Sequence, residues 1–152
     1  MRVATAADIP AIVRITNAAY AIEKFFVAVD RTDADAVQRL MAKGTFLVVD
    51  DAHGEIAGSV YVEVRGARGY FGLLSVDPAR QGTGLGRTLV NAAEAHVRAA
   101  GAGAMDIRVV NLRAELPPFY RKLGYVEFGE DHEPIPQATR PCHYLLMTKT
   151  LV

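Results

Sequence analysis

The segment between residues 46 and 76 constrains the fold more than any other part of the chain. Three apolar stretches, over residues 46–49, 56–64 and 70–76, are separated only by short turns that contain glycine. The middle stretch alternates valines with polar residues, which is the two-residue period of a β-strand. Because such short turns can join only antiparallel neighbours, the three stretches are predicted to form an antiparallel meander.

The pattern changes after this meander. A loop over residues 77–86 carries proline and glycine, and it leads into an amphipathic helix that is predicted to stop at Gly101. Apolar and polar residues alternate again over residues 105–109, which predicts another strand. A strand, a crossover helix and a second strand make a βαβ unit, so the strands 70–76 and 105–109 are predicted to be parallel.

The flanking segments complete an α+β fold. Thr5 and Asp8 have the spacing of a capping box at the start of a first helix. We expect one domain over residues 1–152, built on a mixed, mostly antiparallel sheet of roughly six or seven strands with about four helices. The remaining predicted elements are strands over 2–4, 125–130 and 143–151, and helices over 6–20, 33–42 and 117–123.

Composition excludes several classes of protein. Hydrophobic residues make up 51% of the chain and charged residues 22%, which argues against long disordered stretches. Basic and acidic residues number 17 each, and this balance argues against a dedicated nucleic-acid binder. The single cysteine, Cys142, allows no intrachain disulfide, and the spacing of the four histidines predicts no metal site. No signal pattern and no membrane-length apolar run is present, so a soluble cytoplasmic protein without membrane contact is expected.

The loop over residues 78–87 carries the most informative pattern. Its three glycines lie between a strand end and a helix start, where glycine lets a ligand approach the main chain closely. Unpaired N–H groups and the helix dipole favour an anion there, so a phosphate or pyrophosphate is the expected ligand. The spacing fits neither a Walker loop nor a dinucleotide fingerprint, which weakens the alternative of a nucleotide-binding protein.

Two motifs in the chain resemble those of one known family. Gln81, Gly84 and Gly86 form the pattern Q-x-x-G-x-G, and residues 119–125 read F-Y-R-K-L-G-Y. In this order, separated by a helix and a strand, they resemble the motifs of the GNAT superfamily of acyl-CoA-dependent N-acyltransferases. The order of predicted elements along nearly the whole chain is also similar to the family fold.

The resemblance implies a site for acetyl-CoA as a co-substrate. In the family, the strand before the loop pairs with the pantetheine arm, and the loop amides hold the pyrophosphate. Arg80 and Arg87 could add positive charge, although exposed arginines are common without such a role. The residues that match the cofactor-binding positions are Leu74, Ser75, Val76, Gln81, Gly82, Thr83, Gly84, Leu85, Gly86 and Arg87.

The same resemblance assigns catalytic candidates. The family tyrosine that matches Tyr120 lies near the thioester sulfur, so Tyr120 is expected to act as the general acid; the alternative is a core tyrosine. Glu23 is the first candidate for binding and deprotonating the amine, because its segment forms a wall of the acceptor site in the family. An exposed loop glutamate is the alternative, and Glu63, Asp106 or ordered water would then supply the base.

Two further positions carry side chains that could contact the cofactor or take part in the reaction. Asn111 lies nine residues before Tyr120, and the sequence leaves open whether it contacts the cofactor. Cys142 stands beside His143, which is the pairing of a covalent nucleophile. Adjacent residues of a strand point to opposite faces, so direct attack by the amine is expected instead.

These observations predict an N-acetyltransferase that moves an acetyl group from acetyl-CoA to a primary amine. The alternative is a non-catalytic acyl-CoA-binding sensor on the same fold. The sequence does not identify the acceptor, which is expected to be a small-molecule or peptide amine. The sequence leaves open whether the chain forms a homodimer.

Overall fold

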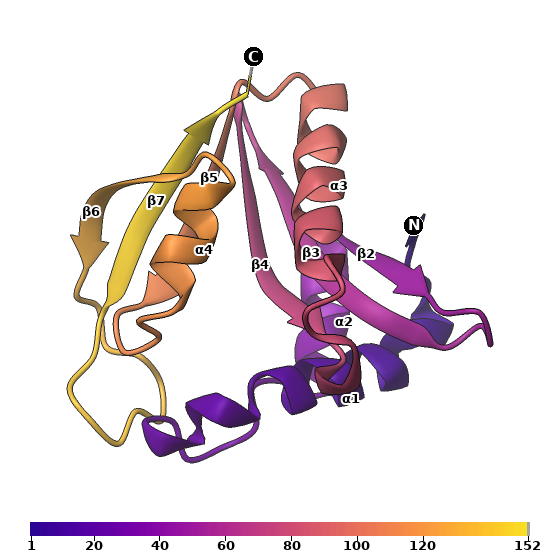
Figure 1. Cartoon of the computed structure of the whole chain (residues 1–152), viewed down its shortest axis with the longest axis horizontal. Helices are drawn as coiled ribbons and strands as arrows, with labels where there is room; N and C mark the ends of the chain where they lie inside the picture. The colour runs from indigo at the N-terminus through magenta and orange to yellow at the C-terminus, as the bar shows by residue number, and fades with distance from the viewer. Residues whose placement is uncertain (152) are drawn as a thin grey trace.

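Seven strands form one sheet in the order β1-β2-β3-β4-β5-β7-β6 (Figure 1). The computed structural model describes residues 1–151, and the predicted domain also includes Val152, which lies outside the described residues. Five of the six strand pairs in this described part are antiparallel, and β4 and β5 run parallel as predicted. The strands are β1 (Arg2–Val3), β2 (Thr45–Asp50), β3 (Ile56–Arg65), β4 (Arg68–Val76), β5 (Ala104–Val110), β6 (Val126–Asp131) and β7 (Tyr144–Thr150).

Within residues 1–151, four α-helices and three short 3-10 helices accompany the sheet. Together with the mixed sheet they confirm the predicted α+β class. Among residues 1–151, no helix combines the length and the apolar character needed to span a bilayer. The helices are η1 (Ala6–Asp8), α1 (Ile9–Ala19), η2 (Ala21–Phe25), α2 (Ala34–Lys43), η3 (Pro78–Arg80), α3 (Leu85–Ala99) and α4 (Leu116–Lys122).

The first helical region differs from the prediction in one respect. The sequence predicts one helix over residues 6–20, and the structure divides it into η1 and α1. Pro10 lies in the first turn of α1 and has no N–H to donate back to η1, so the regular helix begins only there. The predicted capping box is present, with the Thr5 amide donating to Asp8 Oδ2 at 2.7 Å.

An extra residue in β4 shapes the middle of the sheet. Ser59 of β3 pairs with Ser75, and Tyr61 pairs with Gly72, so two β4 residues stand opposite one residue of β3. One of these two, Leu73, has a left-handed φ of 52°. Such a bulge bends its strand. Beyond the short parallel ladder that ends at Tyr70, β4 therefore diverges from β5 (Figure 1).

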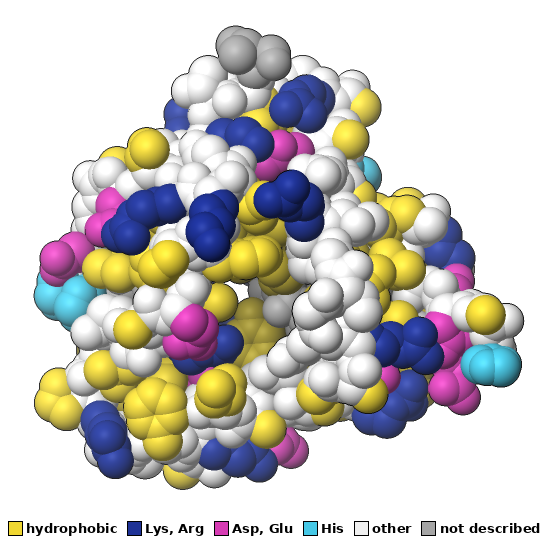
Figure 2. All heavy atoms as spheres, in the orientation of Figure 1, with side chains coloured by type: hydrophobic (Ala, Val, Ile, Leu, Met, Phe, Trp, Pro, Cys, Tyr) yellow, Lys and Arg dark blue, Asp and Glu magenta, His cyan; other side chains and the backbone are white. Residues whose placement is uncertain are grey.

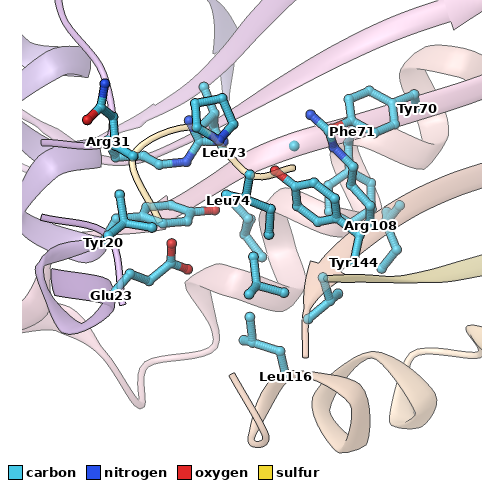
Figure 3. A pocket seen from close by; sticks show the side chains of 18 of the residues that line it. Tyr20, Glu23, Arg31, Tyr70, Phe71, Leu73, Leu74, Arg108, Leu116 and Tyr144 are labelled. Atoms are coloured by element: carbon cyan, nitrogen blue, oxygen red, sulfur yellow. The ribbon is translucent and has the colours of Figure 1, made fainter. Parts of the chain in front are cut away.

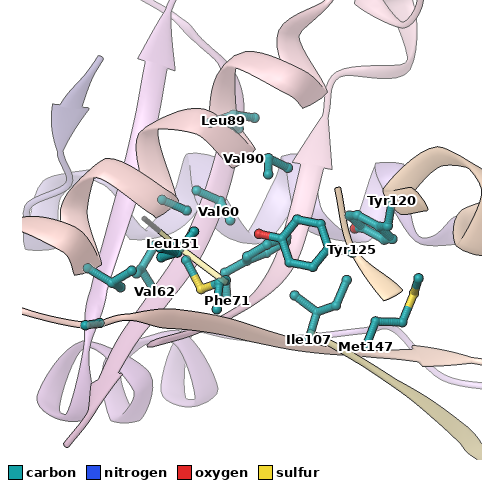
Figure 4. Close-up of a cluster of buried hydrophobic side chains, with 14 of the residues drawn as sticks. Val60, Val62, Phe71, Leu89, Val90, Ile107, Tyr120, Tyr125, Met147 and Leu151 are labelled. Carbon is teal, nitrogen blue, oxygen red and sulfur yellow. The ribbon is translucent and has the colours of Figure 1, made fainter. Parts of the chain in front are cut away.

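Hydrophobic side chains pack on both faces of the sheet. On one face, the strand residues Val60 and Met105 pack with Leu89 and Val90 of α3 (Figure 4). On the other face, Ile12 of α1 belongs to a second cluster that also includes residues of α2 and β2. Figure 1 shows α3 in front of the sheet and α2 behind it. The two-residue alternation of β3 thus supplies both cores at once.

A charged group is buried between α3 and the last strands. The Glu94 side chain is 4% exposed and accepts hydrogen bonds from the Tyr125 hydroxyl at 2.8 Å and from Lys149 Nζ at 2.9 Å. These contacts tie α3 to the strand β7 and to the segment that follows α4. A buried carboxylate is tolerated only when it is paired in this way.

Replacing Glu94 with alanine should therefore destabilise the fold. Glu94→Ala leaves the Lys149 ammonium and the buried Tyr125 hydroxyl without their acceptor, and we expect a loss of about 2–4 kcal/mol in the free energy of unfolding. Urea denaturation followed by circular dichroism measures this loss. Glu55→Ala, in an exposed turn, is the control and should change stability by less than about 0.5 kcal/mol. Equal stability of the two variants would show that the buried network contributes nothing.

Candidate functional site

The divergence of β4 and β5 opens two adjoining cavities. The larger has a volume of about 530 Å³ and lies beside the loop that precedes α3. The smaller, of about 320 Å³, lies between the separated strands. Figure 2 shows the hollow near the middle of this face, bordered by hydrophobic side chains. Four residues line both cavities, and they are Tyr20, Leu74, Leu116 and Tyr120.

The loop before α3 takes the form that an anion site needs. Gly82 and Gly84 have φ values of 82° and 83°, which side chains rarely adopt, and a Cβ atom on either would meet no protein atom within 4 Å. Gly84 caps α3, so the N–H groups of the first helical turn have no partner within the helix. These amides and the helix dipole face the larger cavity and favour a phosphate group there.

Most residues predicted to hold the cofactor line this larger cavity. Two of the ten do not: the buried Ser75 hydroxyl donates to the Leu73 carbonyl at 2.8 Å, and the Thr83 hydroxyl donates to the Arg80 carbonyl at 2.6 Å. Their backbones still belong to the strand and loop that border the cavity. The eight lining residues are Leu74, Val76, Gln81, Gly82, Gly84, Leu85, Gly86 and Arg87.

The two arginines that flank the loop differ in their partners. Arg80 is held by Asp51, with Nη2 and Oδ2 2.6 Å apart, so most of its charge is already neutralised. Arg87 is exposed, lines the larger cavity and has no carboxylate within ion-pair distance in the described part of the chain. Arg87 is therefore the better placed of the two to meet a phosphate.

Tyr120 lies where the two cavities meet. Its ring centroid is 5.1 Å from that of Phe119 and 5.9 Å from that of Phe71, and these contacts fix the direction of its hydroxyl. Burial raises the pKa of Tyr120 well above its usual value, and the nearby Tyr20 adds to the rise. The hydroxyl therefore stays protonated at neutral pH and has a proton to donate.

Glu23 is buried and lines the smaller cavity (Figure 3). Its Oε2 atom accepts a hydrogen bond from Arg113 Nη1 at 2.7 Å, and Arg113 Nε donates to Glu115 at 2.6 Å. The alternative of an exposed loop glutamate is therefore wrong. The segment around Glu23 also places Phe26 in the core while Phe25 remains 45% exposed.

The other proposed bases lie away from both cavities. The Glu63 carboxylate accepts from Arg65 at 2.8 Å and from Tyr61 at 2.6 Å, and these contacts, led by the Arg65 hydrogen bond, lower its pKa. The Asp106 carboxylate accepts two hydrogen bonds from Arg68, which lower its pKa in the same way. Neither residue lines either cavity, so neither is placed to deprotonate an amine there.

The strand pairing explains two further positions. Asn111 continues the β5–β7 ladder, and its Oδ1 accepts from the His143 amide at 2.8 Å, so its side chain is engaged there and lines neither cavity. The antiparallel pairing of β6 and β7 also stacks His132 on His143, with ring centroids 4.4 Å apart, and brings Glu130 Oε2 within 3.4 Å of His143. The wide spacing of these histidines in sequence hid this cluster.

Several residues of the smaller cavity escaped sequence reasoning. Tyr20 lines both cavities, and burial raises its pKa to about 12. Arg108, Tyr70 and Tyr144 lie across the smaller cavity from Glu23 (Figure 3). No local motif marks Tyr20 or these three residues, because each of the four lies in a different segment of the chain. Alternation on β5 shows only that Arg108 points away from the core.

A family model supports the reading of the two motifs. The model described as "Acetyltransferase (GNAT) domain" matches residues 14–134, which is most of the chain. Among curated relatives, a mycothiol acetyltransferase of Saccharopolyspora erythraea is 27% identical over 130 residues, covering 84% of this chain and 43% of the relative. One from Mycobacterium sp. is 38% identical over 88 residues, covering 54% and 29%. The chain thus spans less than half the length of the curated relatives it matches.

Solved structures show the same fold. Ard1 from Thermoplasma volcanium superposes with a TM-score of 0.82 at 17% identity, covering 99% of this chain and 96% of that one. The structure of yncA from Salmonella typhimurium with its cofactor acetyl-CoA gives a TM-score of 0.76 at 22% identity, with 99% and 92% covered. At these identities the likeness establishes the fold alone.

Proposed function

Since this chain belongs to the GNAT family of acetyltransferases, we propose that it transfers an acetyl group from acetyl-CoA to a primary amine. The observation that carries the proposal is the pair of adjoining cavities that meet at Tyr120. The larger fits the coenzyme, with the pyrophosphate against the glycine loop and the pantetheine arm along the unpaired edge of β4. The smaller then holds the acceptor.

The reaction follows from this placement. The neutral amine attacks the thioester carbonyl, a C–N bond forms, and the C–S bond breaks as the coenzyme leaves. The amine loses one proton and the sulfur gains one, so the products are an N-acetyl amide and free CoA. Holding both substrates at the shared wall supplies proximity, and no enzyme-bound acyl intermediate is needed.

Tyr120 is the proposed general acid. A thiol has an ordinary pKa near 8.5 and a phenol near 10, so a proton can pass between them when the groups are in contact. The burial that raises the pKa of Tyr120 also disfavours a bare thiolate in the same cavity, which makes proton delivery to sulfur more valuable. Tyr20, which lines both cavities, is positioned to orient the reacting groups.

Glu23 is proposed to bind the amine. Oε2 is engaged by Arg113, and Figure 3 shows the carboxylate directed into the smaller cavity. An alkylammonium has a pKa near 10 and must lose a proton before it attacks. Glu23 can hold the ammonium by charge and receive that proton directly or through water.

Substitution of Gly84 tests the proposed coenzyme site. Gly84→Val should abolish the rise in Tm that acetyl-CoA causes, because the branched side chain would occupy the pyrophosphate position. Gly54→Val is the matched control, since Gly54 has a φ of 80° and equally open surroundings in a remote turn. Both variants should lose about 1–2 kcal/mol of stability through backbone strain. A full Tm shift in a folded Gly84→Val protein would remove this loop from the coenzyme site.

Tyr120→Phe tests the general acid. We expect kcat to fall about ten- to a hundredfold while the Kd for acetyl-CoA stays the same. Tyr125→Phe removes a hydroxyl that bonds to Glu94 in the core, and it should leave kcat intact. Unchanged turnover in Tyr120→Phe would reduce that residue to a core tyrosine. Tight acetyl-CoA binding by the unmodified protein with no turnover across an amine panel would instead favour the sensor alternative.

Glu23→Gln tests the amine site. The variant should raise KM for a cationic acceptor and move the rise of kcat/KM to higher pH, because the amine must then deprotonate without help. Acetyl-CoA affinity should not change. Glu133→Gln removes an exposed carboxylate that lines neither cavity and should match the parent protein in both measurements. If Glu23→Gln also matches the parent, ordered water is the base.

A further inference from the structure

The smaller cavity adjoins a third hollow, which we call the basic groove. The groove has a volume of about 430 Å³ and lies between α2 and the bulged part of β4. Five residues line both spaces, so the two adjoin. These shared residues are Arg31, Tyr70, Gly72, Leu73 and Arg108.

The groove concentrates positive charge in a chain whose net charge is zero. Its single acidic lining residue, Glu63, already accepts hydrogen bonds from Tyr61 and Arg65. That carboxylate therefore has little capacity left to neutralise its neighbours. The five basic lining residues are Arg31, Arg39, Lys43, Arg65 and Arg108.

Two of these arginines stand at the passage between the cavity and the groove without a counter-ion. Among residues 1–151, no carboxylate oxygen lies within 4.0 Å of the side-chain nitrogens of Arg31 or Arg108. The Arg108 guanidinium instead stacks on Tyr144, 4.3 Å from the ring centroid. Arg31 lies 5.5 Å from the centroid of Tyr20. Aromatic contact holds each guanidinium in place, and within the described residues no carboxylate competes for its N–H groups.

The acceptor side therefore carries opposite charges at its two ends. Glu23 lines the smaller cavity opposite Arg108 (Figure 3), and the positive charge continues from Arg108 into the basic groove. An ammonium group fits the carboxylate end, and an anionic group fits the arginine end. A neutral or purely cationic acceptor would leave the charges of the groove uncompensated.

We infer that the acceptor is a primary amine joined to an anionic group, with the amine at Glu23 and the anion held by Arg108, Arg31 and the basic groove. The inference rests on the proposed acetyl transfer. Carboxylates and phosphates share the chemistry that arginine recognises, and they accept paired hydrogen bonds from a guanidinium. An ω-amino acid, an acidic peptide with a free N-terminus and an aminoalkyl phosphate all carry this chemistry.

Matched acceptors provide the experiment. Each ω-amino acid, with one to five methylene groups between amine and carboxylate, is compared with its carboxamide, and an aminoalkyl phosphate series is run beside them. The acid should exceed the amide in kcat/KM by about ten- to a hundredfold at the chain length that spans the site. Whether the carboxylate or the phosphate series gives the larger kcat/KM at its best chain length identifies the anion source.

Substitutions identify which basic residues produce the preference for acids over amides. Arg108→Gln and Arg39→Gln should each reduce the acid-to-amide ratio, while activity on the amide changes less than activity on the acid. Arg98→Gln, at the far end of α3 from the coenzyme loop, removes the same charge and should keep the ratio. High salt should reduce the preference, because exposed charges are screened.

The outcomes separate this inference from the proposed function. If amides are acetylated with the same kcat/KM as acids, or if Arg108→Gln keeps the acid-to-amide ratio, the inference is wrong. The proposed acetyltransferase activity is not affected by either outcome. If no acceptor turns over, binding is measured by the Tm of the CoA-saturated protein. Stabilisation by the acids, weakened in Arg108→Gln, supports the anion site even then, and equal stabilisation by acids and amides overturns it.

Discussion

The candidate site depends on one extra residue in β4. The bulge at Leu73 interrupts the register with β3 and turns the strand away from β5, so the sheet is continuous at one end and divided at the other. A regular β4 would pair with β5 along its length and close both cavities. Backbone groups on the separated edge are then available to a ligand instead of to a neighbouring strand. Strain at a non-glycine residue with positive φ is the cost of this opening.

The local parts of the fold were open to prediction. Periods of two and 3.6 residues, glycine turns and the strand–helix–strand sequence depend on near neighbours, and the meander, the parallel pair and the family were all confirmed. The split of the first helix at Pro10 was missed because the apolar spacing continues through it. The bulge was missed because register depends on two strands, and a single strand shows only its alternation.

The candidate site also has one part that local sequence predicts and one part that it does not. The coenzyme loop is one contiguous segment, so its geometry could be expected from its glycines and the helix that follows. The acceptor side is assembled from distant segments: Glu23 and Arg113 are 90 residues apart, and Arg108 reaches the same cavity from the middle of β5. Partners at such separations are set by packing. This is also why Glu63 and Asp106 remained plausible bases until the structure placed both outside the lining of the two cavities.

The wall shared by the two cavities has a thermodynamic consequence. Tyr20, Leu74, Leu116 and Tyr120 each line both cavities, so in the proposed reaction any effect of one ligand on the order of these side chains also reaches the other ligand. Linkage requires the effect to be reciprocal: if coenzyme tightens acceptor binding by some factor, acceptor tightens coenzyme binding by the same factor. In the proposed reaction, this wall of four side chains is the part of the site through which one substrate would change the affinity for the other.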